Sequence, residues 1–150
     1  MSVAAATDRL TALELSAWRG MLETHARLTH ALDSEMRAEH GLPVSSYEVL
    51  MFLGEAPGHR MRMSDIADRI LLSRSGLTRL VDRLEELGYV SRCAVESDGR
   101  GQFAKLTPAG VDKLAAARRT HLTGVRAHFL ERLTEDDQRV LGEIWDRISA

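Results

Sequence analysis

Residues 62–110 read RMSDIADRILLSRSGLTRLVDRLEELGYVSRCAVESDGRGQFAKLTPAG, and the order of patterns in this stretch decides the fold. The segment Met61–Met63 at its start is short enough to form only an edge strand. Ser64 follows as the expected N-cap of a first helix over 65–71, because a serine hydroxyl accepts hydrogen bonds from the unpaired amides of a helix start. The stretch therefore opens with a short strand and a helix.

A second helix is predicted from about Arg74 to Leu87, with Ser73 as its N-cap. Its apolar residues recur at spacings of three and four and so form one buried stripe: Leu77, Leu80, Val81, Leu84 and Leu87. The other face carries small, hydroxyl-bearing and charged side chains: Ser75, Thr78, Arg79, Asp82 and Arg83. A helix with small residues and an arginine in its first turns can approach a DNA major groove closely.

A hairpin is predicted after Gly88, which suits the left-handed end of a helix. Residues 89–95 alternate like a strand, and residues 102–106 form the returning strand. Asp98 and Gly99 lie in the intervening turn, where glycine accepts a positive φ. A strand, two helices and a hairpin in this order predict a winged helix-turn-helix within a mainly α (α+β) chain.

The sequence resembles the MarR (multiple antibiotic resistance regulator) family of transcription factors. The resemblance rests on LSRSGLTRLVDRLEELG at 72–88, and on Asp98-x-Arg100 followed by LTPAG at 106–110. It implies a single domain over residues 1–150, with a winged helix-turn-helix DNA-binding lobe at 45–106. It also implies that the long helical segments 11–40 and 108–150 form a homodimer.

The resemblance and the chemistry of the side chains together assign roles on double-stranded DNA. Arg79 is expected to read a base, because a guanidinium pairs bidentately with guanine. Arg100 is the family's minor-groove arginine, and Asp98 holds the hairpin tip in shape. Backbone phosphates are the expected partners of Ser73, Arg74 and Ser75, with Thr78 on a phosphate or a thymine methyl and Arg83 beside them on the same face. A two-fold dimer would prefer a pseudo-palindromic operator with half-sites about one helical turn apart.

Composition limits the other functions that the chain could have. The net charge is −2 over 150 residues, so DNA affinity must come from local charge rather than from a generally basic chain. Residues 60–105 carry nine basic and seven acidic side chains. No apolar run approaches the roughly 18 residues of a membrane span, and the start of the chain does not resemble a secretion signal. With one cysteine, the sequence favours a cytoplasmic protein.

The flanking helices are expected to have more apolar surface than one small lobe can cover. A helix over about 12–39 carries an apolar stripe that includes Trp18 and Met36. A further helix should begin with Ser45 and Glu48 as a capping box. Thr107 and Pro108 start a helix to about residue 132, and Thr134 caps a last helix, with Asp137 three residues on, which presents Val140, Leu141, Ile144, Trp145 and Ile148. These faces are expected to bury one another across a two-fold axis.

Regulation is predicted less directly than DNA binding. The resemblance implies a repressor that a small aromatic or anionic effector releases, with a pocket that includes Trp18, Met21, His25 and Met51. Cys93 is expected to be a small buried hydrophobe, and the alternative is a redox-responsive regulator that uses its thiol. No cofactor or metal site is expected: His121 and His128 share a helix face, but a metal needs more ligands than this pair.

Two other function classes compete with a DNA-binding regulator. A winged helix can pair with a protein instead of DNA, in which case substitution of Arg79 and Arg100 would leave function intact. An enzyme would need a nucleophile elbow, a glycine-rich phosphate loop or clustered acids, and the sequence offers none of these motifs.

Overall fold

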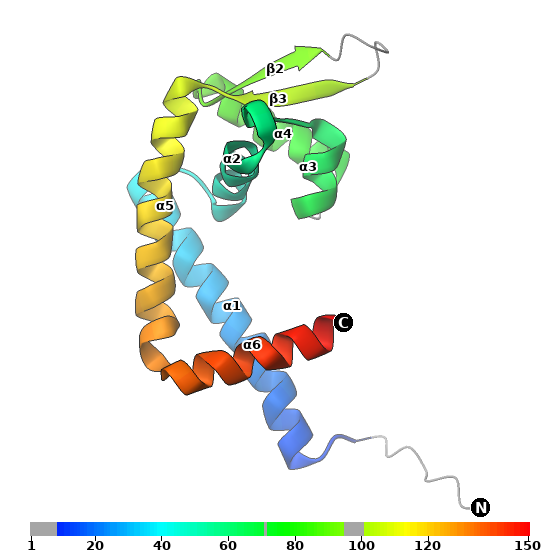
Figure 1. Ribbon diagram of the computed structural model, residues 1–150, viewed down its shortest axis with the longest axis vertical. Helices are drawn as coiled ribbons and strands as arrows, with labels where there is room; N and C mark the ends of the chain where they lie inside the picture. Colours follow the sequence, from blue (N-terminus) through cyan, green and yellow to red (C-terminus); the bar gives the residue numbers. More distant parts are fainter. Residues whose placement is uncertain (1–8, 71, 95–100) are drawn as a thin grey trace, which may run out of the picture.

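The computed structural model describes residues 9–70, 72–94 and 101–150. A winged lobe sits at one end of a stem made by two long helices, and a last helix turns away from the other end of the stem (Figure 1). The helices are α1 (Ala12–His40), α2 (Val44–Glu55), α3 (Met63–Ile70), α4 (Arg74–Glu86), α5 (Pro108–His128) and α6 (Glu135–Ser149), with short 3-10 turns at Pro57–His59 and Leu130–Arg132. The strands are β1 (Arg60–Arg62), β2 (Val90–Ala94) and β3 (Gln102–Leu106). The structure thus confirms the predicted mainly α chain with a small sheet.

The three strands form an antiparallel sheet in the order β1-β3-β2. Val90 pairs with Leu106, and Met61 pairs with Ala104. These four residues point to the lobe interior, since side chains alternate between the two faces of a sheet. Val90, Ala104 and Leu106 are buried there. The neighbouring residues of each strand point to the opposite, outer face.

The buried core lies in the winged lobe and in the parts of α1 and α5 that meet it. It contains the stripe of α4 predicted from the sequence, although Leu80 is only half-buried and Leu87 is 37% exposed. The apolar side of α2 packs on that stripe. The core residues are Met36, Leu42, Tyr47, Val49, Leu50, Leu53, Ile66, Ala67, Leu77, Val81, Leu84, Val90, Ala104, Leu106, Leu114 and Ala117.

Three helix starts agree with the sequence prediction. The Ser73 hydroxyl accepts from the Gly76 amide at 3.0 Å, and the Thr107 hydroxyl accepts from Gly110 at 3.0 Å. Thr134 and Asp137 form a complete capping box. Gly88 has φ 80, as expected for the residue that stops α4. These helix ends depend on neighbours within a few positions, so local sequence identifies them.

Other boundaries differ from the prediction. Ser64 is not an N-cap, because β1 ends at Arg62 and α3 begins directly with Met63. The expected capping box of Ser45 and Glu48 is wrong as well, since α2 begins at Val44. Instead, the Val44 amide donates to Asp33 of α1 at 2.9 Å. A carboxylate eleven residues earlier thus replaces the local cap.

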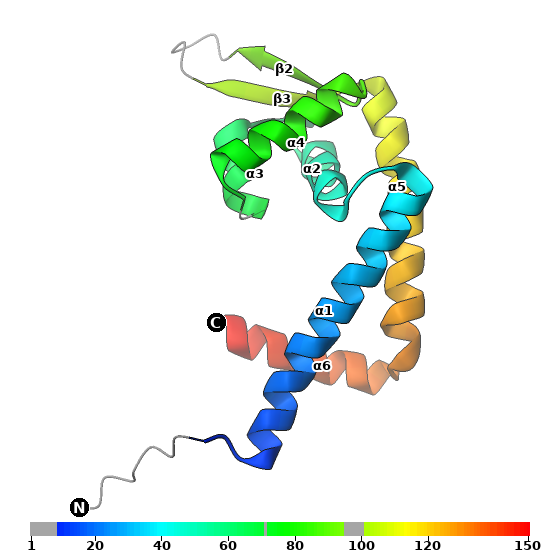
Figure 2. The same ribbon diagram turned by 180° about the vertical axis from the view of Figure 1, so that it is seen from behind.

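The stem is an antiparallel pair of α1 and α5 (Figures 1 and 2). Gly124 allows their close approach, because a Cβ there would overlap Leu32 of α1. The Thr120 hydroxyl donates to Glu39 at 2.8 Å and lies 2.8 Å from His40 Nε2. Polar contacts therefore reinforce the packing at the lobe end of the stem.

The end of α4 is tied to the start of α5. The Thr107 hydroxyl donates to the Gly88 carbonyl at 2.6 Å, and the Thr107 amide donates to the Tyr89 carbonyl at 3.0 Å. Gly110 packs so closely that a Cβ would overlap the Tyr89 carbonyl oxygen. The first turn of α5 therefore belongs to the winged lobe.

The last helix, α6, has no such support. α5 ends at His128 rather than near residue 132, and the 3-10 turn Leu130–Arg132 leads into α6. No residue of α6 is buried, and Trp145 and Ile148 are 43% and 68% exposed. Of the helices in the described part of the chain, none is long and apolar enough to cross a membrane.

Candidate nucleic-acid interface

The first turns of α4 form an exposed polar surface on the outside of the winged lobe (Figure 2). The Ser73 and Ser75 hydroxyls lie 3.2 Å apart, and either can donate outward. The Thr78 hydroxyl donates to the Arg74 carbonyl at 2.8 Å. Because this bond uses the only donor of Thr78, its methyl group is the better candidate for a contact on a base.

Three arginines follow along the same exposed face. Arg83 lies 3.7 Å from Glu86, and both side chains are more than 60% exposed, so this pair is weak. Within the described residues, neither Arg74 nor Arg79 has a carboxylate within 4.0 Å. Two of the three guanidiniums are thus not committed to an intramolecular ion pair there.

The acids of α4 are held by Arg92 of β2. Its guanidinium lies 2.6 Å from Asp82 and 3.3 Å from Glu85, and it donates to the Thr78 carbonyl at 3.1 Å. The Arg92 amide also donates to Glu85 at 3.0 Å. Only 17% of the Arg92 side chain is exposed. These contacts fix α4 against the hairpin and keep two acids away from the arginines of the outer face.

Sequence reasoning missed this role of Arg92, although a signal was present. Arg92 has the same strand parity as Val90, which points inward. A charged residue at an inward position of a strand needs a buried or half-buried partner. Asp82 lies on the polar face of α4, and its ion pair is with Arg92 of β2.

A hollow of about 400 Å³ lies between α3, α4 and β3. Arg74 and Thr78 line it, as expected for side chains at the base of the recognition surface. Arg62 and Gln102 line it too, and sequence reasoning assigned no role to either. The sheet therefore adds polar groups next to the start of α4.

The predicted hairpin-tip residues Asp98 and Arg100 lie outside the described residues. Strands β2 and β3 lead to this segment, with Ala94 paired to Gln102 as their last pair. The roles given to Asp98 and Arg100 remain predictions.

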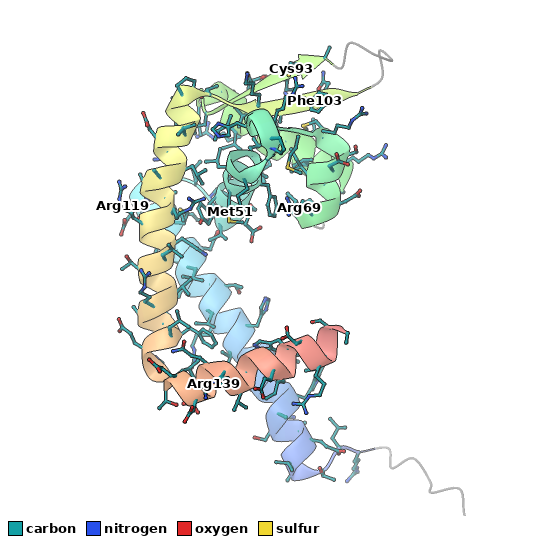
Figure 3. The ribbon with its side chains drawn as sticks, viewed as in Figure 1. Met51, Arg69, Cys93, Phe103, Arg119 and Arg139 are labelled. Carbon is teal, nitrogen blue, oxygen red and sulfur yellow. The ribbon has the colours of Figure 1, made fainter. Side chains whose placement is uncertain are left out.

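The residues predicted for an effector pocket are spread over two helices. Trp18 and Met21 are 53% and 38% exposed on α1, and His25 is exposed on the same helix. Met51 is half-buried on α2, on the side toward α6 (Figure 3). The hollow beside α4 contains none of the four. One copy of the described chain does not gather them into that cavity.

The other candidate ligands are placed separately. Among the described residues, no group of three or more His, Cys, Asp or Glu side chains could hold a metal ion. His121 lies 4.8 Å from the Tyr47 ring between centroids, and His128 is bonded to Glu35. Cys93 is exposed on β2, in contrast to the expectation of a buried thiol (Figure 3).

His121 lies where α5 meets the lobe. Burial lowers the pKa of its imidazole below the ordinary value, and Glu48 opposes this shift. The Nδ1 atom is buried without a hydrogen-bond partner among the described residues. A neutral ring fits this environment better than a charged one.

Known proteins share both the fold and much of the sequence. AbsC of Streptomyces coelicolor, a MarR family transcriptional regulator, is 38% identical, with a TM-score of 0.87 over 95% of this chain and 96% of AbsC. The chain belongs to the MarR family. The family model itself matches residues 40–101. Sco3205, a MarR family regulator from the same organism solved in complex with DNA, is 38% identical and has a TM-score of 0.87 over 94% of this chain and 88% of Sco3205.

A curated relative gives the same assignment. The HTH-type transcriptional regulator PrsX of Escherichia coli is 31% identical over 112 residues, 75% of this chain. The match spans 58% of the length of PrsX. These MarR-family relatives are transcriptional regulators and not enzymes.

Proposed function

We propose that this protein is a homodimeric regulator that binds a specific sequence of double-stranded DNA. The observation that carries the proposal is the exposed face of α4, on which Arg74 and Arg79 have no carboxylate within 4.0 Å among the described residues. The lock between Arg92 and the acids of α4 supports the same function, because a helix that reads bases needs a fixed orientation. The DNA complex of Sco3205 gives a precedent in a related protein.

Each side chain on this surface has a distinct part. Arg79 reads a base edge, most favourably guanine. Ser73, Ser75 and Arg74 bind backbone phosphates, Arg83 adds charge beside them, and Thr78 packs its methyl against a thymine. Arg100, supported by Asp98, enters the flanking minor groove. Phosphate contacts position the helix, and base contacts supply the specificity.

The unburied apolar surface at the chain ends supports a homodimer. Large side chains are exposed just before α1, on its first half and on α6: Leu10, Leu13, Trp18, Leu22, Val140, Trp145 and Ile148. Such a surface is typical of a contact with another chain. A second copy related by a two-fold axis would cover both faces and present two α4 helices to successive major grooves, about 34 Å apart on a pseudo-palindromic operator.

The regulator acts as a repressor that a small aromatic or anionic effector releases. Trp18, Met21 and His25 present an aromatic, an apolar and a titratable side chain on one stretch of α1, and Met51 lies on α2. An effector shifts DNA affinity only if it binds one spacing of the two reading helices better than another.

Binding of the purified protein to DNA from the upstream region of its own gene tests the proposal. Titrations across a salt series should give sequence-specific binding that weakens steeply with salt. Arg79→Ala should weaken operator binding by about 1–3 kcal/mol and relax base preference at one position. Arg119→Ala is the matched control, since Arg119 projects from the outer side of α5 (Figure 3).

Two results would contradict this function. Equal affinity for operator and random DNA at every salt concentration would remove sequence-specific binding. Unchanged operator affinity in Arg79→Ala and Arg100→Ala would favour a winged helix that pairs with protein instead.

A further inference from the structure

The outer face of the sheet carries a second basic surface, in addition to the exposed face of α4. It consists of Arg60, Arg62, Phe103 and Lys105, here named the basic platform. Arg60 pairs with Lys105 and Arg62 pairs with Phe103 between β1 and β3, so all four side chains point to one face. The three cationic residues are exposed, and Phe103 is half-buried between them.

The two arginines of the basic platform are held on the phenylalanine ring. The guanidinium carbons of Arg60 and Arg62 lie 5.0 and 5.5 Å from the Phe103 ring centroid. Stacking on an aromatic face orients a guanidinium and leaves its N–H groups available to an acceptor. Two donors are therefore fixed in place before any partner binds.

The charge of the platform is unfavourable for the isolated sheet. Arg60 lies directly opposite Lys105 on the neighbouring strand. Like charges in this position destabilise a pair of strands. Within the described residues, no carboxylate lies within 4.0 Å of any of these three cations. An anionic partner would relieve this repulsion.

Among the described residues, the acids that border the platform lie at one side of it. A hollow of about 480 Å³ borders β1, and Glu55 and Asp65 line it together with Arg69. Arg69 is itself stacked on Phe52, 4.6 Å from the ring centroid. The acids lie toward α2 and α3, whereas the other outer-face residues of the sheet, Ser91 and Cys93, are uncharged. An anion can therefore approach from the side of β2 and β3.

We infer that the basic platform binds the phosphate backbone of duplex DNA that flanks the operator half-site. This inference rests on the proposed function, because β3 is one of the two strands of the hairpin that would enter the minor groove. A hairpin that reaches DNA brings the outer face of its own strand near the next stretch of the same duplex. Oriented guanidiniums suit phosphate oxygens, and contacts with the backbone need no particular sequence.

The effect of duplex length on affinity tests the inference. One duplex ends at the operator, at about 20 base pairs, and another extends it by about one helical turn of random sequence on each side. The native protein should bind the longer duplex about tenfold more tightly. The double variant Arg60→Ala/Lys105→Ala should lose this gain and keep its affinity for the short duplex, since neither residue lines the hollow beside α4 that Arg62 borders. Its salt slope on the long duplex should fall by about 0.9 for each phosphate that the protein no longer neutralises, or about 3 to 4 for a dimer.

Two further variants separate charge from structure. Arg60→Lys/Lys105→Arg keeps the charge and should retain most of the gain with length, which shows that the strands still fold. Arg118→Ala/Arg119→Ala removes two exposed arginines from α5 and should behave as the native protein does.

Three outcomes would overturn the inference. The alanine variant could gain affinity with length as much as the native protein does, which would leave the two cations as protection of the sheet edge against pairing with another strand. It could lose affinity equally on both duplexes, which would place the two cations on the operator itself. It could bind every duplex normally but fail to regulate transcription, which would indicate that the basic platform binds an acidic protein instead of DNA. Failure of the native protein to bind either duplex would instead contradict the proposed function.

Discussion

The winged lobe buries most of its large apolar side chains, whereas the two ends of the chain leave many of theirs exposed. The lobe buries Leu50, Ile66, Val81 and other core residues completely within one chain. By contrast, α6 buries none of its residues, and Leu13 near the start of α1 is 82% exposed. This contrast fits the proposed homodimer, in which the winged lobe folds within one copy and a second copy covers the ends.

The greatest change should come from substitutions at the ends. Val140→Asp/Ile148→Asp places charges on the apolar face of α6 and should convert the dimer to a monomer. Because two linked half-site contacts become one, affinity for a palindromic operator should fall by about 100-fold or more. Sedimentation velocity and DNA titration measure the two changes.

Arg139→Asp is the control for this double variant. It changes charge on the opposite, polar face of α6, where Arg139 pairs only with Asp136 among the described residues (Figure 3). The control should stay dimeric and bind DNA normally. If Val140→Asp/Ile148→Asp remained dimeric, the apolar face of α6 would not be part of the dimer interface, and the comparison between the lobe and the ends would fail.

An effect of intermediate size, on stability and on DNA binding, is expected inside the winged lobe. Arg92→Ala removes the contacts with Asp82, Glu85 and the Thr78 carbonyl, so it should lower the free energy of unfolding by about 1–2 kcal/mol. Chemical denaturation measures this change. DNA binding should weaken as well, because α4 loses its fixed orientation.

Arg83→Ala provides the matched comparison for stability. Its exposed pair with Glu86 should contribute less than about 0.5 kcal/mol. If the two variants were equally stable, Arg92 would be a surface residue and not a lock between helix and hairpin.

The smallest effect on stability is expected from His121, where α5 meets the winged lobe. Burial lowers the pKa of His121 in the folded protein, so the unfolded chain binds the proton more readily. Stability should therefore be unaffected above about pH 6.5 and should fall as pH decreases below that value. Denaturation midpoints between about pH 7.5 and 5.5 measure the change, and His121→Gln should reduce it.

A second half-buried histidine, His40, and the carboxyl group of Asp33 must be distinguished from His121. Burial also lowers the pKa of His40, and the positive charge of Lys113 lowers it further. His40→Gln is therefore measured in parallel. Hydrogen bonds from Arg37 and Val44 lower the pKa of Asp33, whose contribution is lost only at more acidic pH. A pH response that is identical in His121→Gln and the native protein would exclude His121 as its source.

Local signals in the sequence were enough to predict most of the fold. Ser73, Thr107 and Thr134 are recognisable as caps because each bonds an amide three residues away. The failure at Ser45 has the opposite cause: the group that caps α2 is Asp33, on another helix. A cap supplied through tertiary structure leaves no pattern at the helix start.

The candidate site was likewise predicted only in part from the sequence. The exposed face of α4, including Thr78 and Arg79, follows from helical periodicity alone. The lock at Arg92 depends on how β2 lies against α4, and the basic platform depends on the pairing of β1 with β3. Strand parity was a signal, not used in the sequence prediction, that Arg92 points inward, and its partners are seen only in the folded chain.

The junction of α4 and α5 connects the winged lobe firmly to the stem, so that the stem can act as a lever arm. Thr107 and Gly110 hold the first turn of α5 against Gly88 and Tyr89, so the helix cannot pivot freely where it leaves the lobe. With 21 residues, α5 is about 31 Å long. A tilt of about 5° at its far end then displaces the lobe by about 3 Å, close to the roughly 3.4 Å rise of one base pair along a DNA strand. In the proposed regulator, a small tilt at the far end of the stem would therefore shift each reading helix by about one base-pair step.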